Sequence, residues 1–322
     1  LQAYGIFRSR HDFMNIFGGP SRETLSSREL VLEDGRVYEV DLAAGTRRQM
    51  LLTGEQSKTE EYRTIYDHRR RVLAERADLK RLLSDRRQQV QAERSDMRLV
   101  QAVVQEQGDE YFIYTGASAP FWGLYNLLDF EGMMTALHDA PDDVFYLMDD
   151  LLEQTLEYAQ AFANAGGHGV RVEECLASAD LLSEPMYERF ALPYEEKLFA
   201  GLRRIGLKTI LYFCGHVVPR LPALRDLPID ALMVEESKKD FIIDIGEVRA
   251  GVGPGLCLLG NVDAYEIVRK GSPAQLEAEI ERQVRVAGAD GAFILSAGSP
   301  ITLDTPPERI DLLVEYARRV EV

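Results

Sequence analysis

The residues of this sequence best suited to chemistry stand where apolar runs end. Cys214 closes one apolar run and lies two residues before His216, and Glu174 and Cys175 close an earlier run. Thiolate, imidazole and carboxylate are ligands that zinc takes in proteins, and a catalytic zinc keeps one position open for substrate. These four residues are therefore candidate metal ligands.

The directions of these side chains depend on which face of its strand each residue occupies. Side chains alternate along a strand, so Tyr212 lies on the face of Cys214, and Glu174 lies on the face of the valines before it. Neighbouring parallel strands lie about 4.8 Å apart. If both faces point inward, Cys214 meets Glu174, and Cys175 turns inward only where its strand has ended. A buried thiol of the core and a solvated His216 are the alternatives.

Two more strand ends carry polar residues. Glu235 and Glu236 follow one apolar run and are candidates for general acid or base work. Asn261 and Asp263 close the next run. They are candidates for substrate contact, with capping of the following loop as the alternative.

Positioning these residues requires strands that all end at one edge of a sheet. Short apolar runs alternate with amphipathic helices, and the predicted strands are 111–116, 169–174, 208–214, 231–236, 256–263 and 291–298. This alternation predicts parallel βαβ units. No Gly-x-Gly-x-x-Gly opens a helix after the first strand, which disfavours a dinucleotide-binding fold. We predict an α/β fold, a (β/α)8 TIM barrel, with its chemistry at the carboxyl ends of the strands.

The N-terminal part is expected to extend this barrel. An Asp-Gly pair at 34–35 between two β-prone runs predicts a hairpin. Residues 57–107 are charged, with apolar residues at helical spacing, and predict two or three helices; a docking face for an acidic partner is the alternative. We therefore expect an N-terminal hairpin and extension at 1–55 and the barrel at 56–322.

Composition narrows the class of protein. The formal net charge of −16 over 322 residues disfavours nucleic-acid binding, because phosphates need a basic surface. No apolar run approaches the roughly 18 residues of a membrane span, and the start lacks the pattern of a signal peptide. Three cysteines are too few for a disulfide framework and fit a reducing cytoplasm, with Cys257 expected in the core.

Four motifs carry a resemblance to a known family. They are 174–183 with Leu192-Pro193-Tyr194, then Phe213-Cys214-Gly215, then Leu259-Gly260-Asn261-Val262-Asp263, and finally 293–299 leading to Thr305-Pro306. In this order, from about residue 111 to 320, the chain resembles the uroporphyrinogen decarboxylase superfamily, especially its cobalamin-dependent methyltransferase branch. The resemblance also implies a (β/α)8 barrel.

The resemblance implies two chemistries. Its methyltransferases hold zinc through a His-x-Cys pair and a later Cys, and move a methyl group between a corrinoid protein and an acceptor. Its decarboxylases act on a porphyrinogen without a metal. Here Tyr212 stands at the family His and Ser299 at the later Cys, so only Cys214 remains. The resemblance then implies a zinc shell rebuilt from the other candidate ligands, with Tyr212 as proton donor or substrate-orienting residue.

Our leading hypothesis is a methyltransferase. It moves a methyl group between a small methylated compound (a methoxylated aromatic, a methylamine-type donor or a thiol) and a corrinoid carried by a partner protein, and zinc, about one per chain, polarises the donor. The alternatives are a metal-free decarboxylase of a carboxylated substrate and a barrel that only binds a partner. The predicted catalytic residues are Tyr212, Glu235, Asn261 and Asp263, and the predicted metal ligands are Glu174, Cys175, Cys214 and His216.

Overall fold

The computed structural model describes most of the chain. The described residues are 12–19, 21, 24, 26–33, 36–42, 45–50, 76–238, 240–289, 292–302 and 304–320. Among the helices they form, none combines the length and apolar character needed to cross a bilayer. The predicted turn at 34–35 and the first part of the predicted helical stretch lie outside these residues.

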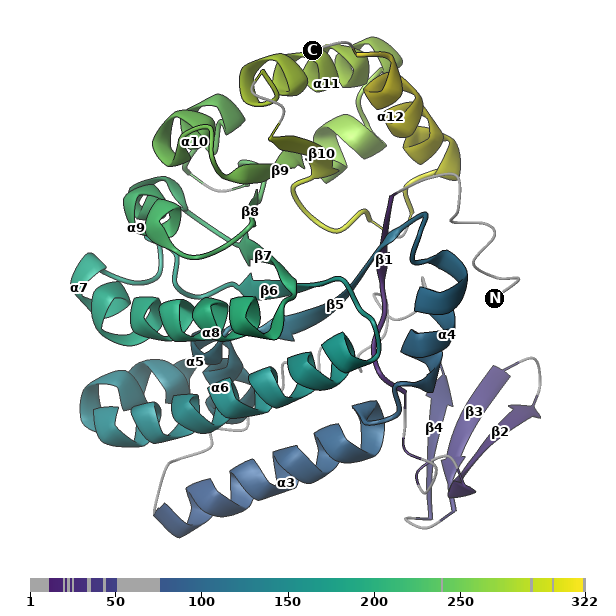
Figure 1. Cartoon of the computed structure of the whole chain (residues 1–322), viewed down its shortest axis with the longest axis vertical. Helices are drawn as coiled ribbons and strands as arrows, with labels where there is room; N and C mark the ends of the chain where they lie inside the picture. Colours follow the sequence, from purple (N-terminus) through teal and green to yellow (C-terminus); the bar gives the residue numbers. More distant parts are fainter. Residues whose placement is uncertain are drawn as a thin grey trace.

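The described strands of the barrel form one parallel, curled sheet in the order β1-β5-β6-β7-β8-β9-β10 (Figure 1). From β5 onward, strands that follow one another along the chain also lie side by side. Their bounds are β1 Phe13–Asn15, β5 Phe112–Ser118, β6 Gly169–Glu174, β7 Lys208–Phe213, β8 Ala231–Val234, β9 Cys257–Val262 and β10 Phe293–Ala297. The parallel sheet and its six later strands confirm the predicted alternation.

Helices cover the outer face of this sheet (Figure 1). They are α3 Arg76–Arg94, α4 Arg98–Gln107, α5 Pro120–Asp139, α6 Pro141–Asn164, α7 Glu184–Met186, the π-helix η3 Tyr187–Ala191, α8 Leu192–Ile205, the 3-10 helix η4 Val218–Arg220, α9 Leu221–Asp226, α10 Ile245–Val252, the π-helix η5 Ala264–Arg269, α11 Pro273–Ala287 and α12 Pro307–Arg319. Local sequence explains their ends. In α11, Ser272 and Gln275 form a reciprocal capping box, so the helix starts where the pattern predicts.

The predicted eight-stranded barrel is confirmed only in part. Among the described residues the sheet has seven strands, and no ladder joins β10 to β1. Helix α12 lies on this open side, where its apolar residues line a cavity together with both edge strands (Figure 1). Strand β1 was not predicted, because three residues are too few to show a periodic pattern.

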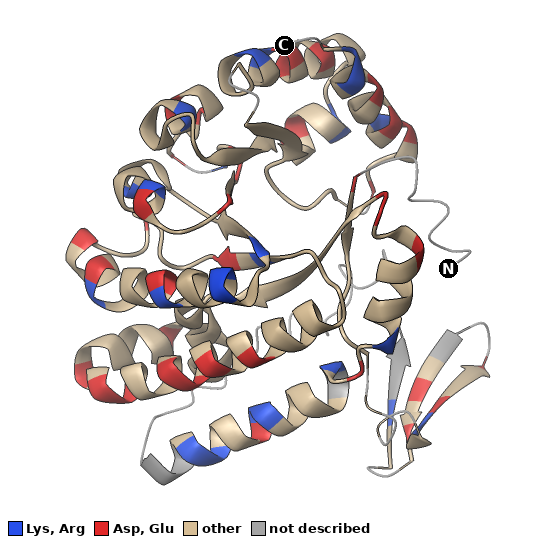
Figure 2. Cartoon of the chain, in the orientation of Figure 1, with Lys and Arg blue, Asp and Glu red and all other residues tan. Residues whose placement is uncertain are grey.

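A small antiparallel sheet precedes α3. It consists of β2 Arg28–Glu33, β3 Arg36–Asp41 and β4 Thr46–Met50, in that order. Farther along, α3 is attached to the acidic face of α6 by Arg87, which binds Asp150 and two further carboxylates of that helix (Figure 2). The division of the chain at residue 55 stays a prediction.

Candidate functional site

Two thiols meet at the carboxyl edge of the sheet. Strands β6 and β7 pair in register, and Glu173 lies opposite Tyr212. Continuing this register by two residues brings Cys175 beside Cys214, and their Sγ atoms lie 3.1 Å apart. The contact with Cys214, followed by burial, raises the pKa of Cys175, so this thiol keeps its proton at neutral pH. The structure therefore pairs the two predicted cysteine ligands.

The turn after Cys214 depends on Gly215. This residue has φ of +81°, and a Cβ atom built on it would lie 2.5 Å from the hydroxyl oxygen of Ser178. Any other residue would be both strained and in collision at this point. Its amide donates to Glu235 Oε2 at 2.9 Å, which fixes the strand end of β8 against that of β7.

The expectation that Glu174 points inward beside Cys214 is wrong. Arg171 lines the interior cavity, so the alternate residues, ending in Glu174, face the helices outside. Glu174 is fully buried, and its Oε1 accepts from the Leu176 amide at 3.0 Å. Burial, followed by the charge of Glu195, raises its pKa to about 8.

His216 does not join the thiols as a ligand cluster. Its ring stacks on Phe241 with centroids 4.7 Å apart, and its amide donates to Asp180. Across the part of the chain that the structure describes, no three His, Cys, Asp or Glu side chains are placed to hold one metal ion. Protein sites for catalytic zinc use three protein ligands. The predicted set is therefore incomplete: Cys175 and Cys214 are together, and Glu174 and His216 are elsewhere.

Tyr212 stands on the inner face, below the thiols. Its hydroxyl donates to the carbonyl oxygen of Gly298 at 2.8 Å. Burial, followed by the nearby Cys214 and Glu235, raises the pKa of Tyr212, which therefore holds its proton throughout the physiological range. A neutral phenol in this position can donate a hydrogen bond but does not act as an anion.

The carboxylates after β8 bind neighbouring groups. Glu235 Oε1 accepts from the ammonium group of Lys238 at 2.8 Å. Glu236 Oε2 accepts from the hydroxyl of Ser299 at 2.7 Å, and burial raises the pKa of Glu236. Ser299, at the position of the family's later Cys, is thus held as a hydrogen-bond donor.

Asn261 and Asp263 hold the backbone around the site. The Asn261 amide group donates to the carbonyl oxygens of Glu235 and Ile243, at 3.0 and 2.8 Å. Asp263 caps η5 by accepting from the amides of Tyr265 and Glu266. These contacts agree with the alternative that the two residues cap the loops around the site. Their direct roles in catalysis stay predictions.

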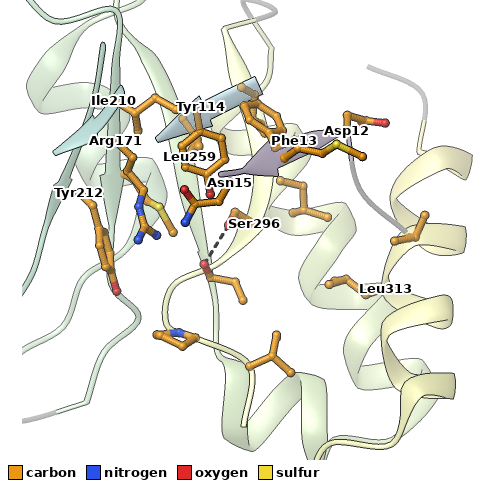
Figure 3. A pocket seen from close by; sticks show the side chains of 18 of the residues that line it. Asp12, Phe13, Asn15, Tyr114, Arg171, Ile210, Tyr212, Leu259, Ser296 and Leu313 are labelled. Carbon is orange, nitrogen blue, oxygen red and sulfur yellow. Dashed lines mark hydrogen bonds between the residues drawn. The ribbon is translucent and has the colours of Figure 1, made fainter. Parts of the chain in front are cut away.

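A cavity of about 810 Å³ lies inside the curled sheet, below the thiols. Its walls are mostly apolar and come from all seven strands of the sheet and from α12. Figure 3 shows Asn15, Arg171 and Tyr212 projecting into it from β1, β6 and β7. The interior of a closed (β/α)8 barrel is packed with side chains. We therefore attribute this cavity to the open side of the sheet.

Several lining residues were not among the predicted site residues. Asn15 and Tyr114 come from strands without a functional motif, and Arg171 lies within an apolar strand. The signal available was Arg171 itself, because a cation between two valines of a central strand must either face a cavity or find a partner.

Fold and site together define an open α/β barrel with an interior cavity and with a thiol pair at the carboxyl edge of the sheet. The family model described as uroporphyrinogen decarboxylase (URO-D) matches residues 67–320, and the chain belongs to this family. The resemblance drawn from the motifs is thereby confirmed.

Relatives with known names fall into two groups. A methylcobamide:CoM methyltransferase, MtbA, of Methanosarcina mazei is 24% identical over 221 residues, which cover 69% of this chain and 62% of that protein. A uroporphyrinogen decarboxylase of Nitrosospira multiformis is 29% identical over 191 residues, 58% of this chain and 50% of that protein. The chain thus spans less than two thirds of these relatives. Both groups are enzymes.

A solved structure shows the same fold. It is a methyltransferase from Methanosarcina mazei, with a TM-score of 0.66 and 18% identity. The match covers 98% of this chain and 82% of the other. At this identity the likeness supports the fold and leaves the reaction to the site.

Proposed function

We propose that the protein is a methyltransferase that moves a methyl group between a small molecule and a corrinoid carried by a partner protein. The observation that carries the proposal is Cys214, which keeps the family's Cys-Gly position and lies two residues beyond Tyr212, a residue that lines the interior cavity. The named methylcobamide:CoM methyltransferases among the relatives support this reading.

The chain's own residues have three tasks in this reaction. The apolar walls hold the small molecule away from water, which strengthens the polar contacts made there. The Tyr212 hydroxyl, protonated and on the inner face, donates a hydrogen bond to the oxygen or nitrogen that loses its methyl group, and that group takes its proton from water when the product leaves the cavity. The thiols of Cys175 and Cys214 lie beyond Tyr212, at the carboxyl ends of the strands, where the proposal expects the methyl group to react. The corrinoid would supply the cobalt centre, and the methyl group moves between this centre and the small molecule.

No step is assigned to zinc. Two thiols are present, and the residues predicted to complete the shell lie elsewhere in the described structure. Activation of the donor therefore rests on Tyr212 and on exclusion of water. The proposed site lies at the carboxyl edge of the sheet, where the Gly215 amide donates to Glu235. We propose that the corrinoid protein binds over this edge.

The test is a spectroscopic assay. The purified chain is mixed with a reduced corrinoid protein and a panel of methyl ethers, methylamines and methyl thioethers. The proposal expects the cobalt absorption to shift on methylation for at least one donor, and Cys214→Ser to slow that shift. If no donor produces a shift, the proposed function fails.

A decarboxylase is the second candidate, favoured by the 29% identity to named uroporphyrinogen decarboxylases. It expects loss of carbon dioxide from uroporphyrinogen without any corrinoid protein. Measuring carbon dioxide release under anaerobic conditions separates the two functions, because methyl transfer releases none.

A further inference from the structure

A second, smaller cavity with three arginines adjoins the large one. It measures about 200 Å³ and lies between the carboxyl end of β5, the segment after β1, and helices α3 and α6. Arg86 and Arg94 reach it from α3, and Arg171 reaches it from β6. The protein as a whole is acidic, with a net charge of −16, so this concentration of cations is local.

Two of these guanidinium groups have a buried N–H without an acceptor. Neither Nε of Arg86 nor Nε of Arg171 has a hydrogen-bond partner in the described structure. Burial, followed by the neighbouring cation Arg94, lowers the pKa of Arg86. A buried charged donor without a partner is unfavourable. An acceptor with negative charge would relieve both conditions.

Few negative groups of the protein offset these cations. Glu173 contacts the Nη2 atom of Arg171 and is the one carboxylate among the described lining residues. The nearby Asp150 binds Arg87 and Gln154, and its charge partly offsets the lowered pKa of Arg86. Three arginines therefore face one glutamate. Hydroxyl groups of Ser118, Thr155 and Tyr158 complete a polar lining.

Arg171 connects the two cavities. It lines both of them. On β5, Tyr114 lines the large cavity, while Gly116, which pairs with Arg171, lines the small one. The small cavity thus lies one layer nearer the carboxyl ends of the strands. One ligand can place an apolar body in the large cavity and a charged group among the arginines.

We propose that Arg86, Arg94 and Arg171 bind the carboxylate, phosphate or sulfonate group of an amphipathic substrate whose apolar body lies in the large cavity. Guanidinium groups suit this role, because their N–H fork matches two oxygen atoms of an oxyanion. That this ligand is the methyl donor or acceptor rests on the proposed function; its binding does not require methyl transfer.

Calorimetric titration of the whole chain tests the site directly. The probes are 4-methoxybenzoate, its neutral counterpart 4-methoxybenzamide, and inorganic phosphate, all at constant ionic strength. The benzoate is expected to bind saturably and about 10-fold or more tightly than the amide, as charge-assisted hydrogen bonds imply, and phosphate is expected to compete with it. Equal affinity for benzoate and amide overturns the proposal. So does binding of phosphate without any binding of the benzoate, since it would mark a site for a free anion.

Variants assign the effect to the arginines. Arg86→Gln and Arg171→Gln are each expected to weaken binding of the benzoate about 10-fold or more and to leave the amide unaffected. Arg285→Gln, on the exposed face of α11, removes the same charge elsewhere and is expected to change neither affinity. Unchanged benzoate affinity in Arg86→Gln overturns the assignment.

Thermal unfolding separates a binding role from a structural one. In buffer without oxyanions, Arg86→Gln is expected to keep or raise the melting temperature, because it removes a buried cation beside Arg94. The stabilisation that the benzoate gives the wild-type chain is expected to disappear. A lower melting temperature combined with normal benzoate affinity would make Arg86 structural. Binding without any methyl transfer would contradict the proposed function alone, and transfer from neutral donors only would contradict this inference alone.

Discussion

At the scale of single residues, the structure defines the protonation state of Tyr212 and its hydrogen-bond partner. It is buried, it donates to the Gly298 carbonyl, and its raised pKa keeps it neutral. Tyr212→Phe removes the hydroxyl but keeps the ring, so we expect kcat/KM for methyl transfer to fall roughly 100-fold, the scale of losing one hydrogen-bond donor to a group that gains negative charge. Tyr265→Phe, an exposed tyrosine, is the control. Activity of Tyr212→Phe close to wild type would show that Tyr212 does not bind the group that loses its methyl.

The thiol pair supports a prediction about metal content. Cys175 and Cys214 are two ligands, and the described residues supply no third near them. We therefore expect metal analysis of the purified chain to find zinc well below one atom per chain, with no change in Cys257→Ser, the control thiol of β9. About one zinc per chain, lost in Cys214→Ser, would contradict this and restore the shell expected from the sequence.

The sequence predicted the thiols better than the carboxylate, for a physical reason. Alternation on β7 placed Tyr212 on the inner face, as observed. On β6 the predicted phase is wrong. The valines expected on the inner face pack under the helices, while Arg171 faces the cavity. Both faces of a central parallel strand are buried, so apolar residues alone do not reveal which face is inside.

At the scale of elements, the loop after β6 is held by Arg220. This side chain is 1% exposed and donates to the carbonyl oxygens of Ala177 and Leu182 and to Glu184. Arg220→Met leaves these acceptors without a donor, so we expect a loss of about 3–5 kcal/mol in the free energy of unfolding. Arg225→Met, an exposed arginine next in the same segment, should cost far less. Denaturant unfolding of both variants measures the difference; similar losses would contradict the role of Arg220.

Helix α8 contributes a buried acid that makes stability depend on pH. Burial raises the pKa of Glu195 to about 7, and Tyr187 donates to it at 2.7 Å. Between its ordinary pKa near 4.5 and pH 7, the folded chain binds more protons than the unfolded chain, so this residue lowers stability as pH rises and has no further effect above.

Glu195→Gln should therefore flatten the loss of stability between pH 5 and pH 7. The glutamine keeps an acceptor for Tyr187, and it cannot ionise. Urea unfolding at several pH values measures the slope, and Glu308→Gln, an exposed residue of α12, is the control. An unchanged slope in Glu195→Gln would mean that Glu195 is ionised in the folded chain at neutral pH.

Element positions were the most predictable part of the fold. Helix α11 is an example, because a proline at its start, a capping serine before it and apolar residues at helical spacing agree at 273–287. Strand β1 and the open side of the sheet were not predictable. Both depend on contacts between segments far apart in the chain, which periodicity does not encode.

At the scale of the whole molecule, the first strand and the last helix of the described barrel line the same cavity. Strand β1 and helix α12 both line it, and the described sheet does not join β1 to β10. A ligand in the cavity contacts both elements and binds only the folded state, so it should stabilise both against local opening. We expect 4-methoxybenzoate to slow amide hydrogen exchange in 13–16 and 307–319 together. The β2-β3-β4 sheet, which does not line the cavity, is the internal control. Slower exchange at α12 without any change at β1, or equal slowing in the control sheet, would contradict binding within the cavity.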